Sequence, residues 1–175
     1  WGNNTSGQFA DGTVTSQSSP IQIGSPSNWT AFSLGSISSH LIKSDGTLWT
    51  AGTIASGNLG YFVAEPVKVG ALTDWKEVTS GSNYSLAVKS TGTLWAWGYN
   101  SFGQLGDGTT GDKSSPVQIG GLSDWSKVSA GASHSLAIKT DGTLWSWGAG
   151  GSGRLGDNSI TSKSSPVMIG GDTNW

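Results

Sequence analysis

An internal repeat of about 50 residues constrains the possible folds of this 175-residue chain more than any other feature of its sequence. A tryptophan recurs at intervals of 46, 50 and 50 residues, at Trp29, Trp75, Trp125 and Trp175. A proline followed by an apolar residue recurs at the same intervals, at Pro20, Pro66, Pro116 and Pro166. Repeats of this period are typical of proteins that pack one supersecondary unit against the next. The sequence therefore predicts an array of similar units.

Each unit has the pattern of short strands rather than helices. No stretch shows a sustained 3.6-residue apolar period, and glycine and proline interrupt the chain too often for helices. Pro116 suits the first position of a strand, and Gly142 supplies the positive φ that a tight hairpin needs. In the third unit the sequence predicts four strands, at 116–119, 125–129, 135–139 and 143–147. Four short antiparallel strands per repeat are typical of a β-propeller blade, so we expect an all-β fold.

Two motifs of the repeat resemble those of the regulator of chromosome condensation repeat family. Residues 97–106, WGYNSFGQLG, are similar to the family signature W-G-x-N-x-x-G-Q-L-G, and residues 131–137, GASHSLA, to G-x-x-H-S-L-A. The resemblance covers essentially the whole chain and implies four-stranded blades, in a propeller that usually has seven. The repeat units run approximately over 20-52, 66-98 and 116-148, with half-units at 1-19 and 149-175.

About three and a half repeats predict an open arc of a seven-bladed propeller. Seven blades of about 50 residues need about twice this length, so the ring cannot close within these residues. Two explanations stay open: the chain is part of a longer one, or two copies combine. Ends that fall inside a blade expose unpaired strand edges, which favours the first explanation.

All ten tryptophans fall into three classes of repeated position, which favours packing over ligand binding. A ligand platform would be expected at a position that the repeat does not explain. Each buried indole removes about 150–250 Å² of surface from water, which provides a core for a chain with 28 glycines. We expect this core to contain Trp29, Trp49, Trp75, Trp95, Trp97, Trp125, Trp145 and Trp147.

No group of residues has the pattern of a catalytic, metal or cofactor site. The chain has no cysteine, and His40 and His134 lie at non-equivalent positions without a local carboxylate or nucleophile motif. The letters of 148–153 match G-x-G-x-x-G, but another turn follows where a dinucleotide site needs a helix. Acidic residues in the loops are interpreted as turn residues that bond their own backbone, at Asp11, Asp107 and Asp157. We therefore expect no enzyme activity, no metal and no cofactor.

The charge balance and apolar pattern exclude further classes of partner. Nine basic against eleven acidic residues leave no basic field for nucleic acid, and no apolar run is long enough for membrane insertion. The expected partner is a protein or the remainder of the chain itself, with the chain as a subunit of an assembly. The apolar cluster Tyr61, Phe62 and Val63 replaces a longer polar loop of the other units and is the candidate contact. An equally weighted alternative is that these residues cover the gap left by Ala51, which stands where other units have tryptophan.

Three functional hypotheses follow. The first is a non-catalytic propeller that serves as a scaffold or interaction module within a larger bacterial or phage structural or surface protein, located outside the cell, on its surface or in a virion rather than in the cytoplasm. The second is a carbohydrate-binding propeller, because Tyr99 and Phe102, like Tyr61 and Phe62, lie outside the tryptophan classes. The third, invited by the family resemblance, is guanine-nucleotide exchange on a small GTPase, which would need a protruding wedge that these repeats lack.

Overall fold

The computed structural model describes residues 1–23, 28–53 and 62–175. The structured elements in this part of the chain are strands, apart from the single-turn 3-10 helix η1 (Gly151–Gly153). None of the helical structure there is long and apolar enough to cross a membrane. The strands are β1 (Trp29–Leu34), β2 (Ser38–Lys43), β3 (Leu48–Thr53), β4 (Phe62–Lys68), β5 (Trp75–Ser80), β6 (Tyr84–Lys89), β7 (Leu94–Gly98), β8 (Lys113–Gln118), β9 (Trp125–Ala130), β10 (His134–Lys139), β11 (Leu144–Gly148) and β12 (Lys163–Ile169).

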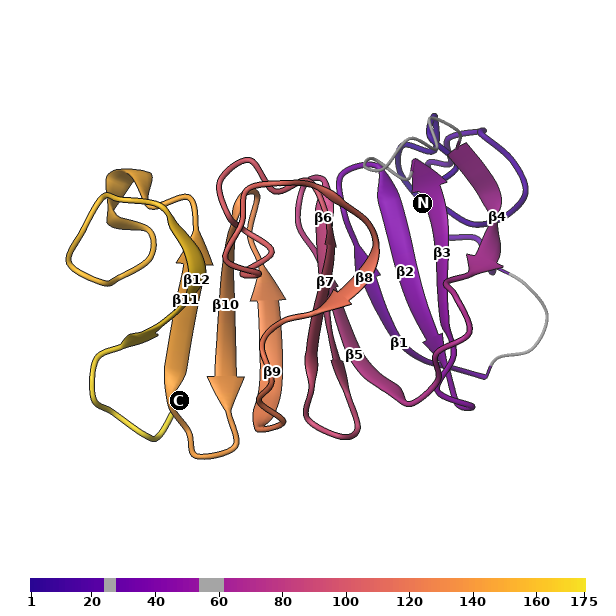
Figure 1. Ribbon diagram of the computed structural model, residues 1–175. Helices are drawn as coiled ribbons and strands as arrows, with labels where there is room; N and C mark the ends of the chain where they lie inside the picture. Colours follow the sequence, from indigo (N-terminus) through magenta and orange to yellow (C-terminus); the bar gives the residue numbers. More distant parts are fainter. Residues whose placement is uncertain (24–27, 54–61) are drawn as a thin grey trace.

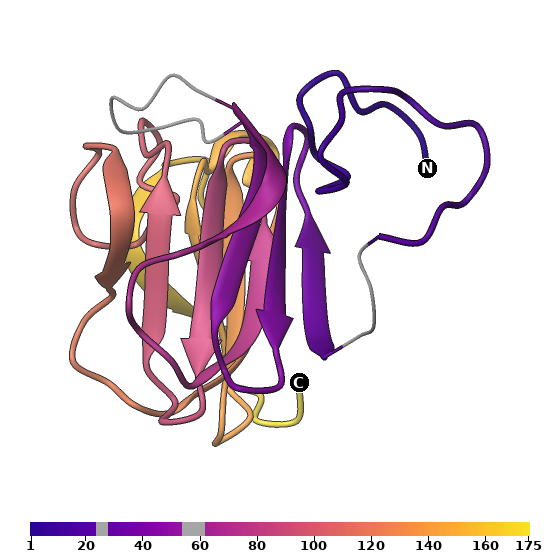
Figure 2. The ribbon, with the colours of Figure 1, turned by 90° about the vertical axis from the view of Figure 1, so that its right-hand side faces the viewer.

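Within the described residues these strands form three antiparallel sheets of four strands each. The order in every sheet follows the chain: β1-β2-β3-β4, β5-β6-β7-β8 and β9-β10-β11-β12. The sheets stand side by side in an open arc, with β5 packed on β1 and β2, and β9 packed on β5 and β6 (Figures 1 and 2). This arrangement confirms the predicted all-β fold with four-stranded blades. We call the contact between the first two sheets the first seam, and that between the last two the second seam.

The sequence repeat and the sheets are out of phase. Strand β8, which contains Pro116, pairs with β7 of the preceding unit and not with β9. A unit counted from the proline thus joins the outer strand of one sheet to the three inner strands of the next. The proline also lies inside its strand rather than at the start as predicted. A proline is tolerated there because β8 is an edge strand, and its pairing with β7 shifts register between Ala96 and Gly98.

The hairpin predicted between the last two strands of a unit joins β10 to β11, and its glycine is required. Gly142 has a φ of +82°, in the left-handed region that residues with a side chain rarely adopt. A Cβ atom there would also lie 2.0 Å from the carbonyl oxygen of Thr173. The position therefore excludes other residues for both conformational and steric reasons.

The apolar core lies in the seams between the sheets. In the second seam Leu86 and Val88 of β6 and Val128 of β9 are buried together with tryptophan side chains. Four of the tryptophans expected in the core are buried, namely Trp75, Trp97, Trp125 and Trp147. The other four are partly buried, namely Trp29, Trp49, Trp95 and Trp145.

A turn from one sheet is inserted into the seam with the next. The carbonyl oxygen of Gln104 accepts hydrogen bonds from Ser135 Oγ at 2.7 Å and from Trp147 Nε1 at 2.8 Å, both in the third sheet. The adjacent Leu105 is fully buried and joins the core of this seam. The loop after β7 therefore links two sheets by polar and apolar contacts at the same point.

At the end of each sheet opposite the inserted turn, a lysine side chain packs between two tryptophans. Trp125 and Trp145 meet edge to face with ring centroids 5.8 Å apart, and Lys139 Nζ lies 5.0 and 4.5 Å from them. Asp124 forms an ion pair with the same lysine at 3.2 Å. Such an arrangement combines aromatic and cation–π attraction in a partly dry environment. The equivalent lysines of the other two sheets are Lys43 and Lys89.

Replacing Trp147 by alanine is expected to lower the free energy of unfolding by about 3–5 kcal/mol, the range for truncating a large buried aromatic residue. The substitution also removes the hydrogen bond to Gln104. Urea unfolding followed by circular dichroism measures the change. Leu122→Ala is the control: Leu122 is half exposed, and its truncation should change stability by less than about 0.5 kcal/mol. Equal effects of the two substitutions would contradict the assignment of Trp147 to the core.

Candidate interaction surface

Three long segments at equivalent positions of the repeat gather at one end of the arc. We call this end the loop face; it consists of segments 1–16, 99–112 and 149–162, at the upper end of the molecule in Figure 1. The short β2–β3, β6–β7 and β10–β11 hairpins lie at the opposite end. Loops held by a rigid scaffold are where binding residues most often lie, so the loop face is the first candidate for function.

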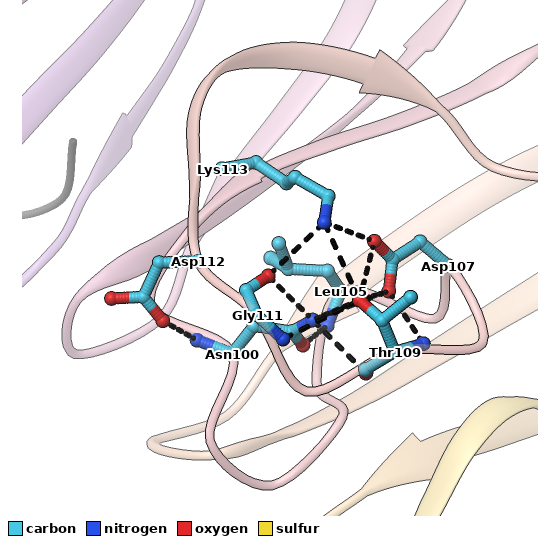
Figure 3. Close-up of polar contacts among 7 residues, drawn as sticks. All are labelled: Asn100, Leu105, Asp107, Thr109, Gly111, Asp112 and Lys113. Carbon is cyan, nitrogen blue, oxygen red and sulfur yellow. Dashed lines mark hydrogen bonds and ion pairs between the residues drawn. The ribbon is translucent and has the colours of Figure 1, made fainter.

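The amide of Asn100 organises segment 99–112. Its Nδ2 donates to Asp107 Oδ1 at 3.2 Å, to the carbonyl of Thr109 at 3.1 Å and to that of Gly111 at 3.1 Å (Figure 3). Its Oδ1 accepts from the backbone N–H of Leu105 at 2.9 Å. Asn100 is fully buried, so these bonds replace water for groups that would otherwise be unpaired. One side chain thereby holds both halves of the loop.

Charged groups surround this amide. Lys113 Nζ pairs with Asp107 Oδ2 at 2.9 Å, and Asp112 Oδ1 accepts from the backbone N–H of Asn100 at 2.8 Å (Figure 3). Burial alone would raise the pKa of Asp107, but hydrogen bonds from Lys113 and Thr109 outweigh it and hold the pKa below its ordinary value. Asp107 is therefore charged at neutral pH and fixed by its partners, so it is unsuited to proton transfer.

The same network recurs in segment 1–16. Asn4 Nδ2 donates to Asp11 Oδ1 at 3.3 Å and to the carbonyl of Thr13 at 3.0 Å, and its Oδ1 accepts from the backbone N–H of Phe9 at 2.8 Å. The predicted turn role of the aspartates is confirmed, since each accepts from the backbone two residues further on, in all three segments. The role of the two asparagines was not predicted from the sequence. The signal that could have identified them is the spacing of seven residues that Asn4–Asp11 and Asn100–Asp107 share.

Segment 149–162 builds the same turn without the asparagine. Gly150 replaces it, and a Cβ atom there would lie 2.2 Å from the carbonyl oxygen of Thr161. The backbone has thus moved into the space of the missing amide. Asp157 still accepts from Ser159 and pairs with Lys163 at 3.5 Å. The run 148–153 contains η1 at its end, and a turn rather than a longer helix follows, as expected from the turn signals after it.

Exposed apolar side chains on the loop face stand where the repeat does not require them. Tyr99, Phe102 and Ile160 are 37%, 46% and 75% exposed. The first two correspond to Ala149 and Ser152 in the next unit. Because the equivalent loops fold with small or polar residues at these positions, packing does not explain the aromatic rings. An exposed apolar residue without a structural role is a candidate contact for a partner.

The candidate contact Tyr61, Phe62 and Val63 is only partly within the described residues. Tyr61 and the side chain of Phe62 lie outside them. Phe62 begins β4, and Val63 pairs with Gly52 of β3 and is partly buried, so these two positions belong to a strand and not to a loop. Contact with a partner at these residues remains a prediction.

The two histidines lie apart and neither belongs to a catalytic arrangement in the described part of the chain. His40 Nδ1 lies 3.0 Å from Ser80 Oγ and its Nε2 lies 3.2 Å from Ser85 Oγ, with no carboxylate among these contacts. Burial, and then repulsion by Arg154, lower the pKa of His134. Among residues 1–23, 28–53 and 62–175, no three His, Asp or Glu side chains converge as metal ligands would.

A cavity of about 260 Å³ lies at the first seam, beside His40, Tyr84 and Trp97. In the second seam Leu105 belongs to the equivalent core. The residue that corresponds to Leu105 in the first unit is Leu59, which lies outside the described residues. The cavity therefore supports no ligand site by itself.

Replacing Asn100 by alanine is expected to lower the free energy of unfolding by about 2–3 kcal/mol, because buried carbonyl groups lose their donor. The loss should appear in urea unfolding, together with faster proteolysis within 99–112. Asn83→Ala is the matched control, since Asn83 is exposed. A loop that stays protease-resistant in the Asn100 variant would contradict the organising role of this amide.

Comparison with known proteins agrees with the repeat and the sheets. Two family models, each described as a regulator of chromosome condensation (RCC1) repeat, match the sequence. The first matches residues 91–138 and 141–174, and the second matches 75–104 and 125–154. Together they span more than half of the chain. A search of curated proteins finds no match.

Solved structures with the same fold are about twice as long as this chain. Human WBSCR16 superposes with a TM-score of 0.85 at 22% identity, over 97% of this chain and 47% of its own. Yeast RCC1 (Prp20), solved bound to Kap60, superposes with a TM-score of 0.82 at 18% identity, over 98% of this chain and 44% of its own. The chain thus spans about half the length of these structures. At such identities the likeness shows the fold alone. The matched repeats place this chain in the RCC1 repeat family, and the likeness agrees with a β-propeller fold.

Proposed function

We propose that this chain is a non-catalytic interaction module that contacts a protein partner through its loop face. The observation that carries the proposal is the exposure of Tyr99, Phe102 and Ile160 on loops that are otherwise fixed. Rigid loops lose little conformational freedom on binding, so apolar residues on them contribute most of their contact energy to affinity. Aromatic side chains are also enriched at the centres of protein interfaces.

The relatives support a protein partner. Yeast Prp20 has been solved in complex with Kap60, and a second structure of Prp20p is described with its binding to Gsp1p and histones. Charges on the loop face are partly paired with one another, Asp107 with Lys113 and Asp157 with Lys163, which favours a partner surface that is apolar and polar rather than strongly charged. A place within a larger structural or surface assembly, at the cell surface or in a virion, belongs to the proposal and is supported by composition alone.

Two other functions are kept as alternatives. Tyr99 and Phe102 are exposed aromatic residues with Ser101 between them in the sequence, and exposed aromatic rings also suit stacking on a sugar ring. Guanine-nucleotide exchange has less support, because the described part of the chain consists of uninterrupted repeats without an inserted wedge. The experiment below separates these alternatives.

The double substitution Phe102→Ser/Ile160→Ser is expected to reduce capture of a protein partner at least about tenfold, since each lost apolar contact contributes roughly 1 kcal/mol or more. The immobilised protein is exposed to an extract of its source cells, bound proteins are identified by mass spectrometry, and affinities are then measured with the purified partner. Leu72→Ser/Leu122→Ser, at the opposite end of the arc, is the matched control and should bind normally. Equal loss in both variants would contradict the assignment to the loop face. Binding to a glycan array that depends on Phe102 would favour the carbohydrate alternative, and nucleotide release from a captured GTPase would favour exchange.

A further inference from the structure

The first seam contains a polar pair where the second seam is apolar. His40 occupies the position of Leu86 and Leu136 in the repeat, and Ser80 occupies that of Leu34 and Ala130. The two side chains meet across the first seam, with His40 Nδ1 3.0 Å from Ser80 Oγ. Histidine and serine occupy these two repeat positions only at this contact within the described sheets. The other sheets form with apolar residues at the same positions, so the fold does not require the polar pair.

The second seam provides the comparison. Leu86 is fully buried there, packed in the cluster that also holds Val128 and Ala130. An apolar contact of this kind has no group that titrates. Two sheets can therefore pack against each other without a histidine at this position. The histidine adds a titratable group that the apolar pair lacks.

His40 is nearly sealed from water in its uncharged form. Only 4% of its surface is exposed, its ring contacts Trp97 edge to face at 5.5 Å, and its Nε2 lies 3.2 Å from Ser85 Oγ. A neutral imidazole donates from one nitrogen and accepts at the other, which two serine hydroxyls can satisfy. Both ring nitrogens are thus paired while the ring is uncharged.

Among the described residues that line the cavity beside His40, none is a carboxylate that could stabilise a positive charge on this imidazole. The other titratable side chains beside His40 along the described lining of its cavity are Lys68 of β4 and Tyr84 of β6. Lys68 is a cation, and burial raises the pKa of Tyr84, which keeps that residue neutral. Burial lowers the pKa of His40 from its ordinary value of 6.5 to about 4.

We propose that the first seam is an acid-sensitive joint, which loosens when His40 takes up a proton while the second seam stays closed. The charged ring needs more contact with water than the 4% of its surface that is exposed in the closed seam, and opening the seam between β2 and the second sheet supplies it. The first sheet then moves relative to the other two, which changes the curvature of the arc.

The direction of the pH dependence follows from linkage. The closed seam binds the proton more weakly than the open seam, where the pKa of His40 returns toward 6.5. Closure is therefore fully favoured above pH 6.5 and weakens as the pH falls toward 4. Carboxylates with lowered pKa values, such as Asp107, take up protons only below this window.

Two backbone amides report the two seams separately. Ser80 N–H donates across the first seam to Ser33 Oγ at 2.9 Å, and Ala130 N–H donates across the second to Thr79 Oγ1 at 3.2 Å. They occupy equivalent positions of the repeat. Hydrogen exchange by NMR, corrected for intrinsic rates, should show the protection of Ser80 falling roughly 20-fold between about pH 7.5 and about pH 5, and that of Ala130 falling much less.

Variants that exchange the two pairs provide the decisive comparison. In His40→Leu/Ser80→Ala the first seam acquires the apolar pair of the second, and the amide at position 80 should lose its pH dependence. In Leu86→His/Ala130→Ser the second seam acquires the polar pair, and the amide at position 130 should gain it. His134 is present in every variant, so its titration contributes equally to the exchange rates of all the proteins compared. An equal fall at both amides in the unaltered protein, or a persistent fall in the first variant, would overturn the proposal. The comparison within the unaltered protein decides even if a variant fails to fold.

Discussion

The insertion of a loop turn between neighbouring sheets is the contact on which the rest of this structure depends. Strands within a sheet are joined by their own ladders, whereas no ladder joins one described sheet to the next. Single backbone hydrogen bonds do cross, such as that from Trp125 N–H to the carbonyl of Gly92 at 3.0 Å. Gln104 and Leu105 add a link at the loop end, one through its carbonyl oxygen and the other through its buried side chain. The same loop is held rigid by Asn100, so the group that fixes the loop face also fixes the spacing of the sheets. Recognition and stability therefore rest on one segment, and a change in either is expected to affect the other.

Much of the fold could be predicted because the repeat presents each pattern several times. Tight hairpins, inner strands and buried tryptophans follow from local signals such as Gly142 and from the periodic positions of Trp97 and Trp147. The phase of the sheets could not be predicted in this way. A repeat has no intrinsic beginning, and the pairing of β8 with β7 rather than with β9 depends on contacts across the loop that the sequence pattern does not express.

The loop face was less accessible to sequence reasoning for a related reason. Asn100 bonds to groups seven to eleven residues away, most of them backbone carbonyls that carry no sequence signature. The turn roles of the aspartates were predictable because they act over two residues. His40 shows the converse case: its position in the repeat, that of Leu86 and Leu136, follows from the sequence, but the serine opposite it lies forty residues further on and in another sheet.

The prolines of the outer strands have a consequence for how the molecule meets its surroundings. Pro66, Pro116 and Pro166 lie within β4, β8 and β12, each at the free edge of its sheet. A proline has no amide proton and resists the regular extended geometry that an added strand would need. The circumference of the arc is thereby poorly suited to capture a strand from another chain, and fibril-like growth along it is blocked at every blade. A chain assembled from many nearly identical β-units would otherwise be prone to such growth, so these prolines allow the repeat to be multiplied while the molecule stays discrete.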